Sequence, residues 1–346
     1  MSRLERLAAR LERPLLVTKG VHVRYLVGFA SSNVALLVEP LGHTRLYTDF
    51  RYVEAARAVA DVELVRTKRD VIGALSELLA GQSVAIEAEH VSVAAADRLR
   101  AGGAELVSTA GVVEGLRAIK EPAEIEAIRA ACRIADAVYG DLAEERFTGR
   151  TEKDLAWFVE RRFRERGADA LAFPPIVASG TNGSRPHAVP QEVEIPAGTL
   201  VTVDMGGLVE GYNSDATRTF ATGPLPDRLA EAYAICAAAQ LDGLAAVRAG
   251  VTGAAADAAA RSTIEAAGLG EAFGHGLGHG VGLEVHEAPT LRPESADTLA
   301  AGNVVSVEPG VYLEGLGGVR IEDLVAVTET GCDVLAGFTK ELVTVR

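Results

Sequence analysis

The chain has 346 residues, 48% of them hydrophobic and 24% charged, which is typical of a soluble globular protein with two domains. Its formal net charge of −14 argues against nucleic acid or an anionic membrane surface as a partner, since no basic patch could easily dominate that field. Three widely spaced cysteines without a C-x-x-C pair, and an N-terminus without the apolar core of a signal peptide, predict a cytoplasmic protein.

The first 112 residues alternate short apolar runs with helical patterns. Leucines at helical spacing predict a helix from residue 4 to residue 11, which Pro14 ends. The alternation that follows predicts an α/β domain over residues 1–112, structural or dimerising in role, because it lacks clustered histidines or carboxylates. Strands are expected at 15–18, 33–39, 44–48, 62–65 and 83–86, and helices at 52–60, 70–79 and 93–100.

A second domain, residues 113–346, begins with two helices. Pro122 lies in the first turn of a long alanine-rich helix, where its missing N–H is harmless, and Thr151 with Asp154 resembles a capping box for the second. The order of the later elements predicts an α+β domain with a curved, mainly antiparallel sheet. A hairpin is expected at 199–204 and 217–220 around the loop 206–212, helices at 227–247 and 254–267, and strands at 304–307, 310–313, 319–327 and 334–335.

A glycine-rich segment, GHGLGHGVGLEVHEAP at 274–289, contains His275, His279 and His286. Glycines cost backbone entropy on folding, so they indicate a place where a side chain would collide with a ligand, a metal shell or a neighbouring strand. The spacing fits neither the dinucleotide fingerprint nor the zincin helix. If a metal is bound here, its other ligands must come from elsewhere in the chain.

Four carboxylates on strand candidates could supply those ligands. Asp204 and Asp215 lie on the predicted hairpin, Glu308 ends the run VVSVE, and Glu322 follows Arg320 by two residues, on the same face of its strand. Unpaired carboxylates this close would raise one another's pKa, whereas two divalent ions would cancel their charge. An oxygen-rich shell with one imidazole suits paired Mn²⁺, Co²⁺ or Zn²⁺, which could lower the pKa of a shared water for hydrolysis.

In context, these residues resemble the dinuclear metallopeptidases of the creatinase/methionine-aminopeptidase "pita-bread" fold, specifically its Xaa-Pro peptidases. The motifs are VDMGGLVEGYNSDATRTF with Asp204 and Asp215, HGLGHGVGLEVHE with His279, VEPGVY with Glu308 and GVRIED with Glu322. The runs RYLVGFASSN and LYTDFRY and the joint RAIKEPAEI are similar to the two-domain members. The resemblance therefore spans nearly the whole chain.

The resemblance implies a role for each motif residue. Asp204 would bind one divalent ion and His279 the other, Asp215 and Glu322 would bridge them, and Glu308 would be both a ligand and a proton shuttle. Mn²⁺ is the expected metal, with Co²⁺ or Zn²⁺ as alternatives.

Further residues are implied to act on the substrate rather than on the metal. His187 and His286 would steady the substrate and the charge that grows on its carbonyl oxygen, and His275 would lie near the substrate. Arg320 would orient a metal-binding carboxylate. The implied reaction is hydrolysis of the bond between an N-terminal residue and proline.

Within this family we favour a prolidase, which cleaves Xaa-Pro dipeptides, because no C-terminal extension follows Leu342; the alternative is an aminopeptidase P acting on longer peptides. Many bacterial prolidases place an arginine where this chain has Thr290, so the substrate carboxylate is assigned to Arg292, or to Arg45 from the partner in an expected homodimer. A more distant alternative is a non-catalytic binding protein on the same fold, although such proteins typically lose ligands and all five are present here.

Overall fold

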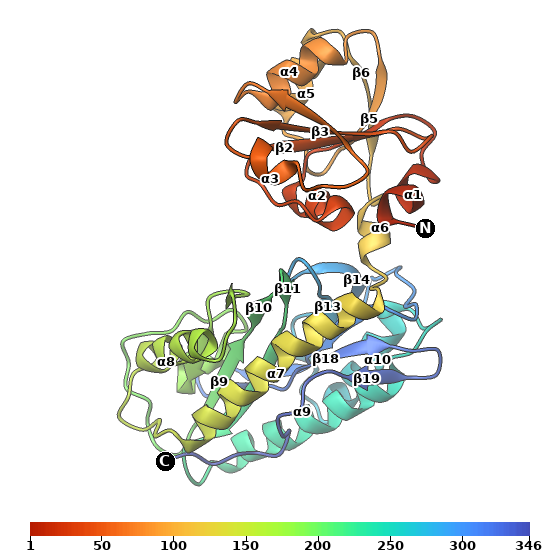
Figure 1. The fold of residues 1–346 in the computed structure, drawn as a ribbon. Coiled ribbons are helices and arrows are strands. Elements are labelled where there is room, and N and C mark those ends of the chain that lie inside the picture. The colour runs from red at the N-terminus through yellow and green to blue at the C-terminus, as the bar shows by residue number, and fades with distance from the viewer. The chain divides into compact units, whose positions relative to one another are not determined.

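The chain forms two units, each with its own sheets and helices (Figure 1). The computed structural model describes residues 1–346. The units are Met1–Arg117 and Ala118–Arg346, so they divide a few residues after the predicted boundary at residue 112. No helix in either unit combines the length and the apolar character that a membrane span requires.

The N-terminal unit is built on a mixed sheet of six strands. The strands are β1 (Leu15–Val17), β2 (Val34–Val38), β3 (Thr44–Asp49), β4 (Glu63–Thr67), β5 (Ser83–Glu87) and β6 (Glu105–Thr109), and the helices are α1 (Arg3–Ala8), α2 (Gly20–Val27), α3 (Val53–Ala56), α4 (Val71–Leu78), α5 (Val93–Ala101) and α6 (Glu114–Arg117). The strand order is β4-β3-β2-β1-β5-β6, with β1 antiparallel to β2 and parallel to β5. Figure 1 shows α4 and α5 on one side of this sheet and α1 and α2 on the other.

The predicted strands of this unit are all present, and three elements were missed. The residues of α2 alternate β-branched and polar side chains, so their pattern is ambiguous until Gly28, at φ 70°, ends the helix. Strand β6 has no fully buried residue and therefore shows only a weak apolar signal. The helix predicted at 52–60 is wrong in length, because α3 ends at Ala56, and α6 was not predicted at all.

The C-terminal unit combines four long helices with antiparallel sheets, which confirms the α+β prediction. Its strands are ordered β12-β9-β8, β14-β13-β15-β18-β19, β11-β10-β7 and β16-β17, and all their pairings are antiparallel. The helices are α7 (Pro122–Glu144), α8 (Glu152–Glu165), α9 (Asp227–Ala246) and α10 (Gly253–Ala266), with short 3₁₀ turns at Gly180–Ser184 and Gly270–Ala272. The strands are β7 (Ala170–Leu171), β8 (Ile176–Ser179), β9 (Leu200–Met205), β10 (Gly207–Val209), β11 (Tyr212–Asn213), β12 (Ala216–Ala221), β13 (Gly278–Gly280), β14 (Glu287–Leu291), β15 (Val304–Val307), β16 (Gly310–Leu313), β17 (Gly317–Arg320), β18 (Asp323–Val327) and β19 (Cys332–Val334).

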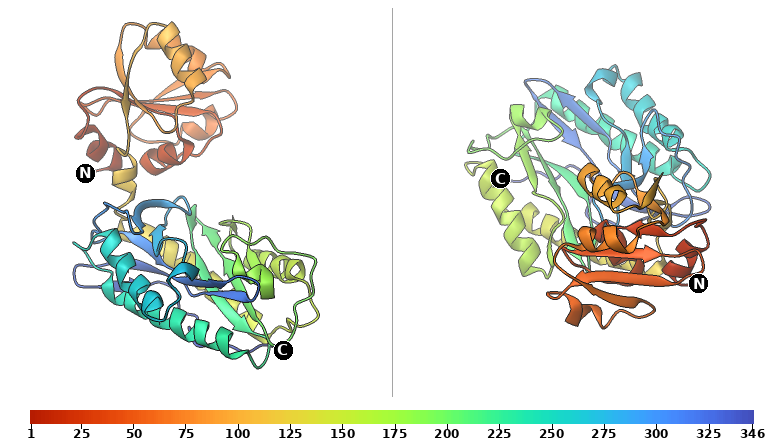
Figure 2. Two further views of the ribbon diagram at one scale, coloured as in Figure 1. Left: turned by 180° about the vertical axis from the view of Figure 1, so that it is seen from behind. Right: turned by 90° about the horizontal axis from the view of Figure 1, so that it is seen from above.

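Two hydrophobic cores hold these helices against the sheets. One joins α7 and α8 to β9 and β12, and the other joins α9 and α10 to β15, β17 and β18. The turned views of Figure 2 show α9 and α10 side by side, and the Thr263 hydroxyl of α10 donates to Asp242 of α9 at 2.6 Å. Because the helices cover one side of the sheets, the polar side chains of the strands are left to face the other.

Two sequence predictions in this unit need correction. The loop predicted at 206–212 contains β10 and β11, which extend the hairpin with β7. The single strand predicted at 319–327 is two strands, because β17 pairs with β16 whereas β18 pairs with β15. The chain changes partners at Ile321 and Glu322, where the Glu322 N–H donates instead to the Thr217 carbonyl at 3.1 Å.

Candidate metal centre

The β9–β12 hairpin carries two of the predicted ligands. Asp204 of β9 lies directly opposite Thr217 of β12, and Asp215 precedes Thr217 by two residues, so these side chains share one face. The neighbouring Val203 points the other way, into the core beneath α7 and α8. Strand alternation thus places both carboxylates on the face away from the helices, where both are buried.

Glu322 completes a group of three buried carboxylates. Oxygen atoms of Asp204, Asp215 and Glu322 all lie within 4.8 Å of one another. Burial raises the pKa of each of the three, and the neighbouring carboxylates raise it further. Asp204 Oδ1 and Glu322 Oε1 are buried without any hydrogen-bond partner. Buried, unpartnered oxygens among clustered negative charges fit divalent cations, which prefer such ligands.

His279 and Glu308 lie close to this carboxylate group. His279 Nε2 is 3.1 Å from Glu308 Oε1 and 3.8 Å from Asp215 Oδ2. Burial raises the pKa of Glu308, but the hydrogen bond with His279 and the nearby charges of His279, His275 and Arg320 together lower it to about 2. The Ser306 hydroxyl donates to Glu308 Oε1 at 2.8 Å and accepts from the His279 N–H at 3.0 Å. The structure therefore brings all five predicted ligands together.

The glycines around His279 are required by the close approach of neighbouring strands rather than by a ligand. Strand β13 lies between β14 and β15. A Cβ at Gly278 would lie 2.0 Å from the Ser306 carbonyl oxygen, and one at Gly280 would lie 2.3 Å from that of Ala288. Only glycine permits this close approach, which sets His279 beside the carboxylates.

Arg320 supports the carboxylate group from the side. Its buried guanidinium donates to Asp204 Oδ2 at 2.7 Å, to the Thr217 hydroxyl at 3.0 Å and to the Tyr312 hydroxyl at 2.8 Å. The Thr217 hydroxyl in turn donates to Glu322 Oε2 at 2.7 Å. Arg320 and Glu322 therefore share a face, as the sequence predicted, even though their strand is broken between them.

Tyr312 was not identified from the sequence. Its hydroxyl lies 2.9 Å from His275 Nε2, so it links that histidine to Arg320. Burial raises the pKa of Tyr312 to about 12. The available signal was strand alternation, since Val311 and Leu313 on either side point into the core and leave Tyr312 on the opposite face.

A pocket of about 690 Å³ opens above these residues. His187 and His286 line it and are exposed to solvent, and the His286 ring lies 4.2 Å from the His279 ring, centroid to centroid. Arg292 is also an exposed lining residue. Arg45 is not among the lining residues: it lies on β3 of the N-terminal unit, where it forms ion pairs within that unit.

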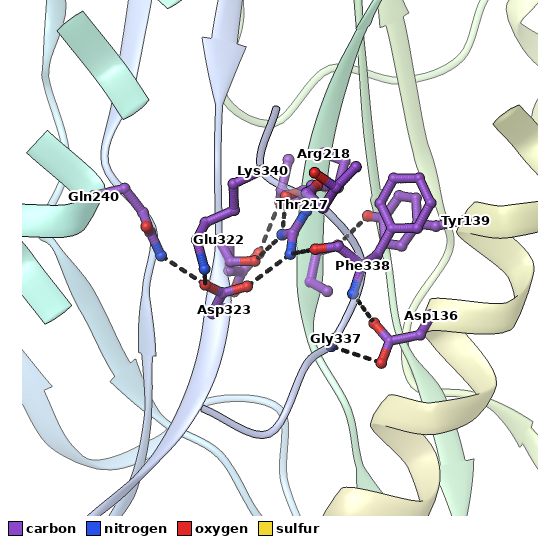
Figure 3. Close-up of polar contacts among 12 residues, drawn as sticks. Asp136, Tyr139, Thr217, Arg218, Gln240, Glu322, Asp323, Gly337, Phe338 and Lys340 are labelled. Atoms are coloured by element: carbon purple, nitrogen blue, oxygen red, sulfur yellow. Dashed lines mark hydrogen bonds and ion pairs between the residues drawn. The ribbon is translucent and has the colours of Figure 1, made fainter. Parts of the chain in front are cut away.

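A second polar network lies behind the metal ligands and was not predicted (Figure 3). Arg218 of β12 donates to Asp323 Oδ1 at 2.7 Å and to the backbone carbonyl of Glu322. Asp323 Oδ2 accepts from Gln240 at 2.8 Å and from Lys340 at 2.8 Å. Because Arg218 holds the carbonyl of Glu322 directly, this network fixes the backbone at the point where the strand breaks.

Helix α7 joins the same network through Asp136 and Tyr139 (Figure 3). The Tyr139 hydroxyl contacts the carbonyl oxygens of Val203 and Ala216 at 3.0 and 2.7 Å, and Asp136 accepts from the Phe338 N–H at 3.0 Å. The backbone on both strands of the ligand-bearing hairpin is therefore anchored from its helical side.

The Arg218→Met variant is expected to be less stable by about 3–5 kcal/mol, because it leaves the fully buried Asp323 without its arginine partner. Lys340 and Gln240 still contact Asp323 and should hold the loss within that range. Denaturant unfolding measures the change. Exposed Arg228 gives a matched control, whose methionine variant should differ from the parent by at most about 0.5 kcal/mol.

Removing divalent ions is expected to lower the unfolding temperature, and more so at higher pH. The pKa values of Asp215 and Glu322 are raised by burial, so in the ion-free chain their favourable contribution is present at low pH and is lost as the pH rises. Bound divalent ions would stabilise the charged forms. Thermal unfolding with and without chelator at about pH 5 and about pH 8 tests this expectation. The expectation would be contradicted if the difference in unfolding temperature between the ion-bound and ion-free chains did not grow with pH.

Comparison with known proteins places these features in context. Residues 126–329 match metallopeptidase family M24, and residues 3–119 match the creatinase/prolidase N-terminal domain. An Xaa-Pro dipeptidase from Pyrococcus furiosus is 34% identical over 94% of this chain and 94% of its own length. The structure of an Xaa-Pro dipeptidase from Bacillus anthracis is 37% identical and superimposes with a TM-score of 0.95 over 99% of both chains. An X-Pro aminopeptidase from Thermotoga maritima gives 32% identity and a TM-score of 0.90 over 99% of this chain and 100% of its own.

Proposed function

The chain belongs to metallopeptidase family M24, and we propose that it hydrolyses the bond between an N-terminal residue and proline, with Xaa-Pro dipeptides as its preferred substrates. The observation that carries this proposal is the group of buried carboxylates with unpartnered oxygens at the floor of a pocket of about 690 Å³. The family and the two-domain pita-bread fold agree with what the sequence motifs predicted.

Two divalent ions would be held by Asp204, Asp215, His279, Glu308 and Glu322. When bound, such ions polarise a carbonyl group and lower the pKa of water. We propose Mn²⁺ as the native ion, with Co²⁺ or Zn²⁺ as alternatives, because the ligand set is oxygen-rich with one imidazole. Metal analysis of the purified chain tests this, and less than one ion per chain after reconstitution would contradict a dinuclear centre.

Glu308 is the proposed proton carrier. It is deprotonated, since the hydrogen bond with His279 and the charges of His279, His275 and Arg320 together lower its pKa to about 2 against the effect of burial. A carboxylate in this position could accept the proton of the attacking water. It would then deliver that proton to the proline nitrogen as the peptide bond breaks. We propose that His286 and His187, both exposed in the pocket, donate hydrogen bonds to the carbonyl oxygen and the substrate.

The proline ring needs an apolar surface, because its nitrogen has no hydrogen for an amide contact. One part of the pocket provides such a surface, which the sequence alone did not indicate. The apolar side chains that line the pocket include Phe173, Pro174, Ile176, Val189 and Val285, from which we propose the ring contact is drawn.

We assign the carboxylate of the dipeptide to Arg292 rather than to Arg45. Arg292 lines the pocket, is exposed and forms no ion pair in the structure. Arg45 lies 2.9 Å from Glu39 and 3.4 Å from Glu63, which already balance its charge. A dipeptide places its free carboxylate close to the scissile bond, so a cation inside the pocket would favour dipeptides over longer chains.

The Arg292→Ala variant is therefore expected to lose roughly 10- to 100-fold in kcat/KM for an Xaa-Pro dipeptide, mainly through KM, because a charged hydrogen bond is lost. An Xaa-Pro-Yaa tripeptide should be affected less. Steady-state kinetics on both substrates measure this, with Arg45→Ala as the control that should leave both nearly unchanged. Equal losses on both substrates would contradict the assignment.

The same assay separates the proposal from its alternatives. A strong preference of the parent enzyme for the tripeptide would make it an aminopeptidase P. If neither substrate releases its N-terminal residue in a metal-dependent way, the chain is a non-catalytic binding protein. We also retain the homodimer and the cytoplasmic location as proposals, the latter supported by the three unpaired cysteines; light scattering and cell fractionation would test them.

A further inference from the structure

The N-terminal unit contains a cluster of potential metal ligands. Ring nitrogens of His22 and His90 and a carboxylate oxygen of Glu114 all lie within 4.8 Å of one another. The prediction that this domain lacks clustered histidines or carboxylates is therefore wrong. It failed because the three residues come from α2, from the loop after β5 and from α6, which are far apart in the sequence.

Glu87, at the end of β5, fixes the orientation of the His22 ring. Its Oε2 accepts from the N–H groups of Thr18 at 2.8 Å and Lys19 at 3.1 Å, and its Oε1 contacts His22 Nδ1. A carboxylate held in this way is an acceptor, so His22 Nδ1 carries a hydrogen, and in the neutral ring Nε2 presents its lone pair. Metal-bound histidines are oriented by carboxylates in the same manner.

The free nitrogen of His22 is aimed at two further ligands. The His22 side chain is fully buried, and its Nε2 has no hydrogen-bond partner. It lies 3.5 Å from Glu114 Oε1, which is 2.7 Å from His90 Nε2. A buried nitrogen lone pair that faces a carboxylate is unfavourable unless a proton or a cation lies between them.

We propose that His22, His90 and Glu114 form a zinc site that is separate from the catalytic centre. Tetrahedral zinc, with ligands at about 2.0–2.2 Å, separates neighbouring ligand atoms by roughly 3.3–3.5 Å. Small shifts of these three side chains would bring their ligand atoms to that spacing. Two imidazoles and one carboxylate are ligands that zinc accepts. Beside the cluster lies a cavity of about 10 Å³ lined by Glu87, His90 and Glu114, which is close to the space that one water needs as the fourth ligand.

Charge also favours a divalent cation. In the zinc-bound form, a divalent ion held by two neutral imidazoles would balance the negative charges of Glu87 and Glu114. The bound ion would tie α2, the loop after β5 and α6 together and so stabilise the N-terminal unit. The competing arrangement is a doubly protonated His22 that holds both carboxylates as an ion-pair network without metal.

The test uses the full-length chain with its catalytic centre disabled by Asp215→Asn and Glu322→Gln. After treatment with chelator and dialysis, ZnCl₂ is added, and both bound zinc and the unfolding temperature are measured. The disabled chain should bind one zinc ion per chain after ZnCl₂ is added, and the bound zinc should raise its unfolding temperature. Absence of zinc binding would overturn the proposal in favour of the protonated network, whatever the catalytic activity of the parent enzyme.

Two histidine variants of the disabled chain locate the ion. His90→Asn should remove both the bound zinc and its effect on the unfolding temperature. His43→Asn is the matched control, because His43 is a half-exposed histidine of the same unit, and it should change neither. If His90→Asn does not fold, Glu114→Gln replaces it, since that side chain is 25% exposed. Zinc binding that survives the loss of His90 or Glu114 would overturn the site.

Discussion

The Asp215→Asn variant is expected to lose its divalent ions and its hydrolysis of Xaa-Pro dipeptides together. Asp215 is close both to the other carboxylates and to the histidine: its carboxylate is within 4.8 Å of the oxygens of Asp204 and Glu322, and its Oδ2 is 3.8 Å from His279 Nε2. Asparagine has the same shape but offers only one neutral oxygen. It would therefore complete neither the carboxylate group nor the ligand pair with His279. The loss of activity should exceed the roughly 10²- to 10⁴-fold that a single general acid–base group contributes.

When ions are absent, the same variant should be more stable than the parent rather than impaired. Neighbouring carboxylates raise the pKa of Asp215 beyond the effect of burial, so replacing it removes a repulsion from the ion-free chain. Ion-free Asp215→Asn should therefore unfold at a higher temperature than the ion-free parent, whereas ions should stabilise the parent alone. Asp97→Asn, at an exposed position of α5, is the control for the substitution itself. Normal turnover by Asp215→Asn after ion loading would exclude the proposed role.

The ligands could be predicted because each lies in a recognisable motif: the acids come from alternating strand patterns, and His279 comes from the glycine-rich segment. Asp204 alternates with the buried Val203, and Thr217, directly opposite on β12, confirms that the two strands form a hairpin in this register. Residues of opposite character at a spacing of two are visible in a sequence without knowledge of the fold. For that reason the sequence predicts the face of each acid even where it misplaces the end of a strand.

The supporting residues could not be predicted because their partners are distant in the sequence. Arg218 has a partner more than a hundred residues away in Asp323, and nothing near either residue indicates the pair. Tyr312 likewise acquires its role only when β16 places its hydroxyl between His275 and Arg320. These contacts depend on which strand pairs with which, and the partner change at Ile321 shows that alternation alone does not determine the pairing.

The N-terminal cluster illustrates the same limit. His22 and His90 stand alone in their own segments, and an isolated histidine in a sequence is uninformative. They meet only because β1 and β5 are parallel neighbours, which brings the chain segments that follow both strands to one edge of the sheet. Sequence patterns within a segment are therefore a better guide to ligands on a hairpin than to ligands assembled from several crossover connections.

Replacing Glu308 with glutamine is expected to reduce kcat by at least about 10²- to 10⁴-fold while leaving the fold intact. Glutamine preserves the shape and can still accept the hydrogen bond from the Ser306 hydroxyl that Glu308 Oε1 receives at 2.8 Å. It cannot accept the proton of the attacking water, and it no longer balances the charge near His279, which lies 3.1 Å away. Steady-state kinetics on an Xaa-Pro dipeptide and metal analysis separate these two losses.

Two further variants help to show whether the loss of proton transfer or the loss of a charged ligand dominates. Ser306→Ala removes the hydrogen bond to Glu308 and the acceptor of the His279 backbone N–H but leaves both ligand side chains in place. It should cost roughly 10- to 100-fold, as is typical when ligands lose a supporting contact. Glu314→Gln, at an exposed position between β16 and β17, should have no effect. If Glu308→Gln binds a full complement of ions yet is nearly inactive, the missing function is proton transfer. If it regains normal kcat at saturating metal, Glu308 is only a ligand, and another group of the pocket must carry the proton.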